Sequence, residues 1–239
     1  MNGLTIYSEF YNRILSKQRF FFDKEDPLLK TISKYASQME EVLNKDSTVY
    51  RSRIMTDDMM FEDSKNDDSN FPVLNKKEIG APPSHCANAG RLNPEHISYL
   101  YVSNTPICSI SELRPAIKTL VAVGKGNINR DVKCLSFLRC PQECDEKYEL
   151  QALQATIWQF GTVVNNPIEY TATQVIAEFI KEIGYQGIVY PSSQTKDKIN
   201  YLLFDPEACD FVSTSSYSIE NISYQAQWLC GDGEETLNS

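Results

Sequence analysis

The sequence predicts an α+β fold, and three observations support this. Runs of β-branched and aromatic residues are mixed with stretches of helical periodicity, and the two kinds do not alternate regularly. The 239 residues are 41% hydrophobic and 11% aromatic, which is enough to bury one substantial core. No internal repeat or low-complexity tract interrupts the chain. We therefore expect a small N-terminal helical appendage at residues 1–47, a main domain at 48–225 and a flexible tail at 226–239.

The N-terminal elements follow from periodicity and composition. Residues 26–46 begin with Asp-Pro and repeat apolar residues at helical spacing, and residues 10–22 also favour a helix. The β-formers of "VYRSRI", residues 49–54, predict a strand. The acidic and polar residues 55–71 then offer little to pack, so we expect a solvated loop there.

The middle of the chain predicts a strand and a short helix. After the turn-rich "GAPPSHCANAG", the segment "ISYLYV" at residues 97–102 has the composition of a strand. Thr105 is suited to cap a helix that has Pro106 at its first position. Glu112 then lies about two turns into this helix, which Pro115 helps to end.

Further strands and two longer helices are expected in the C-terminal half. Thr171 and Gln174 have the spacing of a capping box, and Gly184 is placed to end the helix that they begin. The predicted strands here are residues 119–124, 134–138, 187–190 and 199–205, and the predicted helices are residues 145–161 and 171–184.

Charge and cysteine usage argue against several functional classes. The 23 Lys and Arg against 32 Asp and Glu give a net charge of -9, and no basic run exists to follow a nucleic-acid backbone. No segment has the pattern of a signal peptide or a membrane span, so we expect a cytoplasmic protein without a membrane partner. Seven irregularly spaced cysteines suit reduced thiols. Cys134, Cys140 and Cys144 lack a nearby histidine or a paired CxxC, so we predict no metal site.

Several short motifs occur in one order along the chain. "VYRSRI", "GAPP" and "GRLNP" are followed by "YLYV", "SELRP" and "YTATQVIAEFIKEIGYQGIVYPSSQ…INYLLFDP". In this order they resemble the RES-domain family, named for its arginine, glutamate and serine, over about residues 48–213. The resemblance implies an ADP-ribosyltransferase-like fold, in which helices flank a mixed, split β-sheet.

The same resemblance implies an NAD-consuming enzyme. Members of the family are bacterial, many are toxins of toxin–antitoxin pairs, and they split NAD at the nicotinamide–ribose bond by phosphorolysis or hydrolysis. We therefore expect NAD as the substrate, phosphate as a potential co-substrate, no bound cofactor, and an antitoxin or regulatory protein as a partner. Two alternatives stay open: transfer of ADP-ribose to a protein, as described for some members, and an NAD-binding module without turnover. The oligomeric state is not predicted.

Six residues fall on the family's motifs and are the candidate site. The resemblance assigns catalytic roles to Glu112, Arg91 and Ser192, and substrate-binding roles to Arg51, Tyr50 and Tyr101. Guanidinium groups can hold the pyrophosphate of NAD bidentately, and a tyrosine ring can stack on one of its bases. Breaking the bond builds positive charge on the ribose, which a carboxylate stabilises. Nicotinamide leaves as a neutral molecule, so no general acid is needed, and a serine could bind a ribose hydroxyl or a phosphate oxygen.

Some positions stay open or depart from the family pattern. Arg53 shares a strand face with Arg51, so periodicity cannot say which of them lines the pocket, and Arg114 also competes for the phosphate-binding role. His96 stands where members commonly have glycine, and Leu92 is bulkier than usual after the "GR" motif. Both differences would alter the shape of the pocket.

Overall fold

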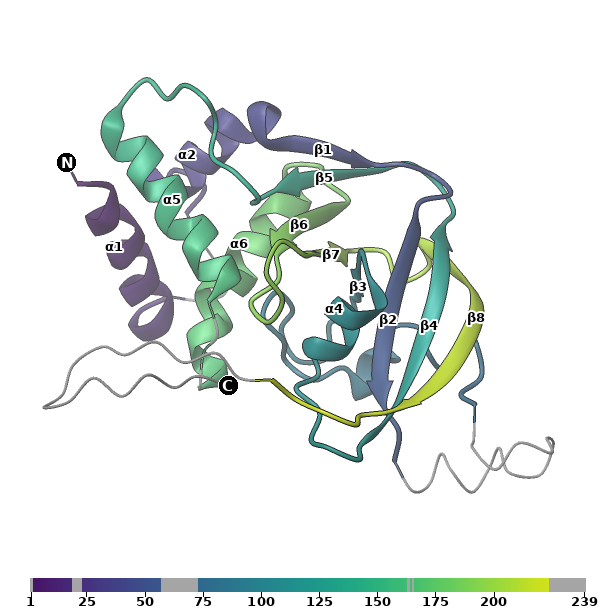
Figure 1. The fold of residues 1–239 in the computed structure, drawn as a ribbon. Coiled ribbons are helices and arrows are strands. Elements are labelled where there is room, and N and C mark those ends of the chain that lie inside the picture. The colour runs from purple at the N-terminus through teal and green to yellow at the C-terminus, as the bar shows by residue number, and fades with distance from the viewer. Residues whose placement is uncertain (1, 19–22, 57–72, 163, 165, 224–239) are drawn as a thin grey trace, which may run out of the picture.

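A mixed β-sheet with helices on its flanks forms the body of the protein (Figure 1). The computed structural model describes residues 2–18, 23–56, 73–162, 164 and 166–223. The strands are β1 (Glu40–Leu43), β2 (Thr48–Ile54), β3 (Leu100–Ser103), β4 (Leu120–Ile128), β5 (Val132–Ser136), β6 (Gly187–Pro191), β7 (Ile199–Leu203) and β8 (Cys209–Ser218). The helices are α1 (Gly3–Ser16), α2 (Pro27–Tyr35), α4 (Pro106–Ser111), α5 (Lys147–Gly161) and α6 (Thr171–Glu182), with short 3₁₀ turns at 36–39, 84–86 and 167–170. The predicted α+β class is confirmed.

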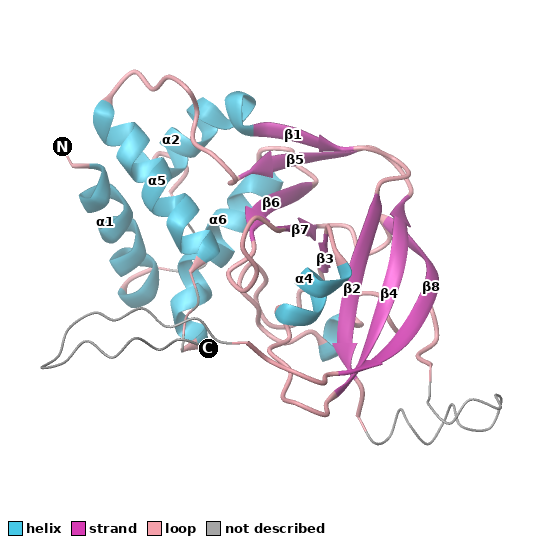
Figure 2. Ribbon diagram, in the orientation of Figure 1, coloured by secondary structure: helices cyan, strands magenta, loops and turns pink. Residues whose placement is uncertain are grey.

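The helices lie in two separate places on the sheet (Figure 2). Helices α1, α2, α5 and α6 gather beside β5 and β6, whereas α4 lies apart from them, against β2 and β3. One buried apolar cluster joins the first group to the sheet and includes Phe10, Leu28, Phe160, Ile176 and Leu202. The burial of this continuous cluster is the main stabilising contribution to the helical end of the molecule.

The N-terminal segment takes part in both the helical layer and the sheet. Helix α1 packs on α5 and α6, and β1 pairs with β5 from Glu40 opposite Leu135 to Leu43 opposite Val132. Asp26 caps α2 and also forms an ion pair with Arg13 of α1. The proposed boundary between an appendage and a main domain at residue 47 stays a prediction.

The sheet splits between β2 and β3. Strand β2 pairs with β4 along its whole length, but it pairs with β3 only through Tyr50 and Ser103. Helix α4, which directly follows β3 in the chain, packs against β2, β3, β4 and β7 around this opening. Two diverging strands and a short helix therefore lie together near the middle of the sheet (Figure 1).

Three sequence predictions for the elements are corrected by the structure. The helix predicted over 26–46 ends at Tyr35, because residues 40–43 gain ladder hydrogen bonds as an edge strand on β5. Helix α1 begins at Gly3, earlier than the predicted residue 10. The predicted capping box is wrong: the Thr171 hydroxyl donates to the carbonyl of Ile168, and the Gln174 amide donates to Gly90.

The other elements agree closely with the predicted positions, with one strand missed. Thr105 caps α4, whose first residue is Pro106, and Gly184 follows α6 with a φ of +96°. Strand β8 was not predicted. Residues 57–71 of the predicted loop and the predicted tail at 226–239 lie outside the described residues. Within the part of the chain that the structure describes, no helix is long and apolar enough to span a membrane.

Candidate functional site

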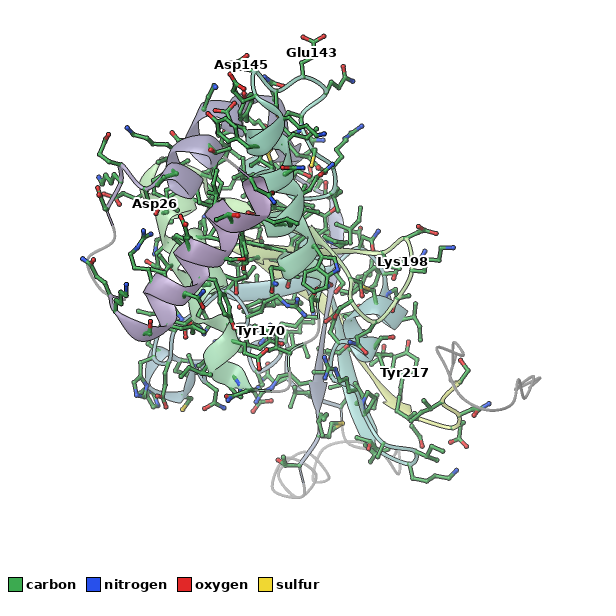
Figure 3. The ribbon with its side chains drawn as sticks, turned by 90° about the vertical axis from the view of Figure 1, so that its left-hand side faces the viewer. Asp26, Glu143, Asp145, Tyr170, Lys198 and Tyr217 are labelled. Atoms are coloured by element: carbon green, nitrogen blue, oxygen red, sulfur yellow. The ribbon has the colours of Figure 1, made fainter. Side chains whose placement is uncertain are left out.

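A pocket of about 480 Å³ opens where β2 and β3 diverge. It lies against α4 and the loop that precedes β3, and Tyr170 contributes from the start of α6 (Figure 3). The residues that line it are Tyr50, Arg51, Ser52, Gly90, Arg91, Tyr101, Val102, Ser103, Ser109, Glu112, Leu113, Arg114, Tyr170, Tyr190 and Asn200. The structure thus brings together five of the six predicted site residues, and the sixth, Ser192, contacts Glu112 directly.

Arg51 is held at the point where the sheet splits. Its Nη1 group donates to the carbonyl oxygen of Tyr101 at 2.9 Å, which bridges β2 and β3 where ladder pairing has ended. Its Nε group is buried and has no hydrogen-bond partner among the described residues. Burial and the neighbouring charge of Arg53 lower the pKa of Arg51 to about 10, so it stays positively charged at neutral pH. A buried cation with an unmatched donor is suited to an anionic ligand.

Arg91 contacts both the pocket and the end of a helix. Its Nη1 group donates to the carbonyl oxygens of Phe160 and Thr162, each at 2.6 Å, which helix α5 leaves without intrahelical partners. Its Nη2 group donates to Ser193 at 3.3 Å, and the guanidinium lies 5.4 Å from the centre of the Tyr170 ring. Arg91 therefore has a structural role beside any role in the pocket.

The loop before β3 is shaped by hydrogen bonds that fix Arg91. The Tyr101 hydroxyl donates to Asn93 Oδ1 at 2.8 Å and accepts the backbone N–H of Leu92 at 3.1 Å. The Thr173 hydroxyl on α6 donates to the carbonyl of Arg91 at 2.6 Å. A Cβ atom on Gly90 would lie 2.4 Å from Asn93 Oδ1, so this position has no room for a side chain.

The backbone of His96 has an unusual conformation in this loop. Its φ is +66°, in the left-handed region that favours glycine, and its N–H donates to the carbonyl of Ala87 at 2.8 Å. The glycine that RES-domain members commonly carry at this position would adopt the same conformation without strain. His96 is exposed and does not line the pocket, so the predicted change of pocket shape does not arise from its side chain.

Glu112 is placed by α4 and oriented by two hydrogen bonds. It is the C-cap residue of α4, and its Oε1 atom accepts from Ser192 Oγ at 2.6 Å and from Asn200 Nδ2 at 2.8 Å. No hydrogen bond to Oε2 occurs in the described part of the chain. One carboxylate oxygen is therefore fixed by the protein, and the other is left for the pocket.

Ser192 has its hydrogen-bonding capacity filled by the protein. It donates its only proton to Glu112, and its oxygen accepts the backbone N–H groups of Gln194 and Thr195 at 3.2 and 3.0 Å. This arrangement favours a positioning role over the direct contact with ribose or phosphate that the sequence suggested.

Sequence reasoning missed Asn200 and Ser103. Asn200 lies on β7 within the apolar "INYLLFD", and Ser103 ends β3 directly opposite it in register. Both side chains are 3% exposed. A polar residue inside an apolar strand was the available signal, since such a group is costly to bury without a partner.

The open choice between neighbouring arginines is resolved by geometry. Arg53 donates to the carbonyl of Glu78 and does not line the pocket, whereas Arg51 does. Arg114 lines the pocket but is exposed, with a φ of +48° just after α4.

The charge balance of the pocket is positive. Neither Arg51 nor Arg91 forms an ion pair with a carboxylate within the residues described, and Glu112 is bound by two neutral groups. Burial raises the pKa of Tyr101 and of Tyr190, so both phenols stay neutral at physiological pH. Two guanidinium groups without acidic partners thus share a pocket with one oriented carboxylate.

Cys134, Cys140 and Cys144, the cysteines considered for a metal site, are not grouped with other ligands in the described part of the chain. Cys134, Cys140 and Cys144 are free thiols, and burial raises the pKa of Cys134 to about 12. Across residues 2–18, 23–56, 73–162, 164 and 166–223, no three His, Cys, Asp or Glu side chains are grouped as a metal site would require.

Comparison with known proteins gives a family match and a likeness to solved structures. No curated protein matches the chain. Among solved structures, the chain is similar to a chain of the M. tuberculosis MbcT-MbcA toxin-antitoxin complex, with 10% identity and a TM-score of 0.45, over 80% of this chain and 94% of that one. The family model described as RES domain matches residues 73–225. Because this match spans more than half of the 239 residues, the resemblance is confirmed and the chain belongs to the RES domain family.

Proposed function

We propose that the protein is an NAD-degrading enzyme that cleaves the nicotinamide–ribose bond. The observation that carries this proposal is the pocket that Arg51 and Arg91, two guanidinium groups without an ion pair in the described part of the chain, line together with the oriented carboxylate of Glu112. A dinucleotide brings two phosphate charges that would pair with the arginines. Its ribose would then lie within the field of the carboxylate, which is where a positive charge develops during cleavage.

The residues present can perform each part of this reaction. The Arg51 Nε donor and the planar fork of Arg91 would bind the diphosphate, and rings such as Tyr50 and Tyr101 would contact a base. Glu112 would stabilise the positive charge that develops on the oxocarbenium-like ribose, which is uncharged in the ground state. Nicotinamide departs with the bonding electrons as a neutral molecule, and ribose C1 then bonds either to a phosphate oxygen or to water, which releases a proton to the solvent.

The activity is tested by incubating the full chain with NAD, with and without phosphate, and separating the products. ADP-ribose would identify hydrolysis, and ADP-ribose 1-phosphate would identify phosphorolysis. Glu112→Gln removes the charge but keeps an oxygen that accepts from Ser192 and Asn200, so we expect kcat to fall about a hundredfold or more with NAD binding largely kept. Glu95→Gln, at an exposed position of the loop before β3, is the matched control and should leave kcat unchanged.

Other outcomes of the same assay would support different functions. Label from NAD that stays on a protein would indicate ADP-ribosyl transfer. Binding of NAD without release of nicotinamide, in wild type and Glu112→Gln alike, would indicate a non-catalytic module and contradict the proposal.

The cellular role that we propose follows from NAD loss. An enzyme of this kind in the bacterial cytoplasm would act as a toxin or defence effector, and a partner protein such as an antitoxin would have to restrain it. Expression of the wild type should lower cellular NAD and arrest growth, whereas Glu112→Gln should do neither.

A further inference from the structure

A buried amide connects the pocket carboxylate to the sheet. Asn200 is 3% exposed, and both ends of its side-chain amide are used. Its Oδ1 atom accepts from Ser103 Oγ at 2.6 Å and from Cys108 Sγ at 3.4 Å, while its Nδ2 atom donates to Glu112 Oε1 at 2.8 Å. The amide therefore joins β3, α4 and β7 at the place where the sheet splits.

The orientation of this amide follows from its neighbours. A hydroxyl and a thiol can donate, so they select the oxygen of Asn200, whereas an ionised carboxylate can only accept and selects the NH₂ group. Ser103 is itself fixed opposite Asn200 in the β3–β7 register. The donor that faces Glu112 is thus set by the strands and not by Glu112 alone.

We propose that Asn200 is a positioning residue for Glu112. Together with Ser192 it binds Oε1, so that the carboxylate is held in one orientation and presents Oε2 to the ribose. This inference rests on the proposed function. It goes beyond it by assigning a role in the reaction to a residue that acts through Glu112.

The substitution Asn200→Asp separates this role from packing. The variant keeps the side-chain shape and the oxygen that accepts from Ser103 and Cys108, but it replaces the donor that faces Glu112 with a second carboxylate oxygen. Two carboxylates at this distance share a proton in preference to ionising together. We expect kcat at neutral pH to fall about a hundredfold, with KM changed far less. The acid limb of the kcat–pH profile should move to higher pH.

The titratable and charged groups near Glu112 decide how the acid limb of the kcat–pH profile is read. The cations that line the pocket with Glu112 are Arg51 on β2, Arg91 before β3 and Arg114 after α4, and Lys198 before β7 acts on the neighbouring Cys108. The kcat profile is measured between about pH 5 and pH 8 in steps of about half a unit. The weak acids are Tyr50, Tyr101, Tyr170, Tyr190 and Cys108; burial raises the pKa of Tyr101, Cys108 and Tyr190. A shift of the acid limb in this window would therefore report the carboxylate pair.

Asn104→Asp is the matched control. Asn104 directly follows β3, and its Oδ1 atom accepts the N–H of Ile199 at 3.2 Å, a bond that aspartate preserves. It does not line the pocket, so the same change of residue type should leave kcat and its pH profile as in the wild type. Should Asn200→Asp fail to fold in thermal unfolding, Ser103→Ala serves instead, because it frees the amide without adding charge. It should lower kcat without raising KM.

A second measurement is independent of turnover. The carboxyl carbon of Glu112 can be titrated by NMR, with Glu112→Gln to assign its signal, and its midpoint should lie at higher pH in Asn200→Asp than in the wild type. If the wild type does not consume NAD, the proposed function fails, but this titration still decides the role of Asn200. An unchanged midpoint, or an active variant with the wild-type pH profile, would overturn the inference.

Discussion

Arg91 and Arg51 line one pocket but are held in different ways. Arg91 satisfies two carbonyl oxygens at the end of α5, so its removal would leave backbone acceptors without a partner. Arg51 makes one bond, to Tyr101, and its buried Nε has no partner among the residues described. Arg91 thus supports the end of α5 as well as lining the pocket, whereas Arg51 lines the pocket with a donor that has no partner among the described residues.

Lysine substitutions at the two positions should therefore differ in their effects on stability and on NAD affinity. Arg91→Lys removes the planar donors from Phe160 and Thr162, and we expect a loss of about 1–3 kcal/mol in the free energy of unfolding. In Arg51→Lys a methylene replaces the unpartnered Nε, so stability should change little while NAD affinity falls. Denaturant unfolding and titration calorimetry with NAD would measure both quantities. Equal destabilisation by the two variants would contradict this distinction.

The residues of the pocket could be predicted from the sequence where a motif marked them. The order of motifs predicted Arg51, Arg91, Tyr101 and Glu112, which all line the pocket. Alternation along β2 could not separate Arg51 from Arg53, because both point to one face and only the tertiary partner of Arg53 removes it from the pocket. Asn200 was hidden because a strand pattern does not show which buried groups meet across strands.

At the scale of elements, α4 determines where the carboxylate lies. This helix has six residues, too few to be stable alone, and Glu112 is its C-cap. Its start is fixed by the Thr105 hydroxyl oxygen, which accepts the N–H of Cys108 at 3.3 Å, and by Pro106. Loss of the cap would loosen the element that holds Glu112.

We expect Thr105→Ala to destabilise the protein by about 1 kcal/mol and to lower kcat more than it changes KM. Thr105→Ser keeps the capping oxygen and should behave as the wild type in both respects. Denaturant unfolding and steady-state kinetics would test the pair. The interpretation would be wrong if the serine variant lost as much activity as the alanine variant.

Elements were predictable where local signals agreed with the tertiary environment. The cap of α4 and the end of α6 at Gly184 follow from local chemistry. Residues 40–43 have helical periodicity but lie at the edge of β5, where tertiary hydrogen bonds outweigh propensity. Strand β8 was missed because "CDFVSTSSYS" is rich in serine and largely exposed.

At the scale of the molecule, a charged cluster joins α2 to α5. Glu149 is 7% exposed and accepts from Lys34 at 2.7 and 2.9 Å and from Tyr35 at 2.5 Å. Burial acts to raise the pKa of Glu149, but the hydrogen bonds from Lys34 and Tyr35 outweigh it, and the net shift is downward. The ionised form is therefore favoured by folding.

Because the pKa of Glu149 is lowered in the folded protein, the stability of the protein depends on pH. A lowered folded-state pKa contributes stability above the unfolded value of 4.5, and the contribution is lost as the pH falls through the folded-state value. We expect Glu149→Gln to lower Tm at neutral pH and the difference from wild type to shrink below pH 4.5. The control Glu182→Gln removes an exposed pair with Lys24 and should change Tm little. A constant difference across the pH range would contradict the assignment.

The whole topology was only partly predictable. Mixed strands and helices predicted the class, but the parallel β5–β6 pair and the single contact between β2 and β3 depend on which strands meet in space. Local periodicity carries no information on such long-range pairing.

The place of β2 in the sheet limits where the chain can be divided. The family match begins at residue 73, yet β2 ends at Ile54 and stands sixth of eight in the sheet order, between β3 and β4. A fragment cut at the start of the match would lose an interior strand together with Arg51, and would leave β4 with an open flank prone to intermolecular pairing. Anyone trimming this protein for expression should retain the segment upstream of the recognised region.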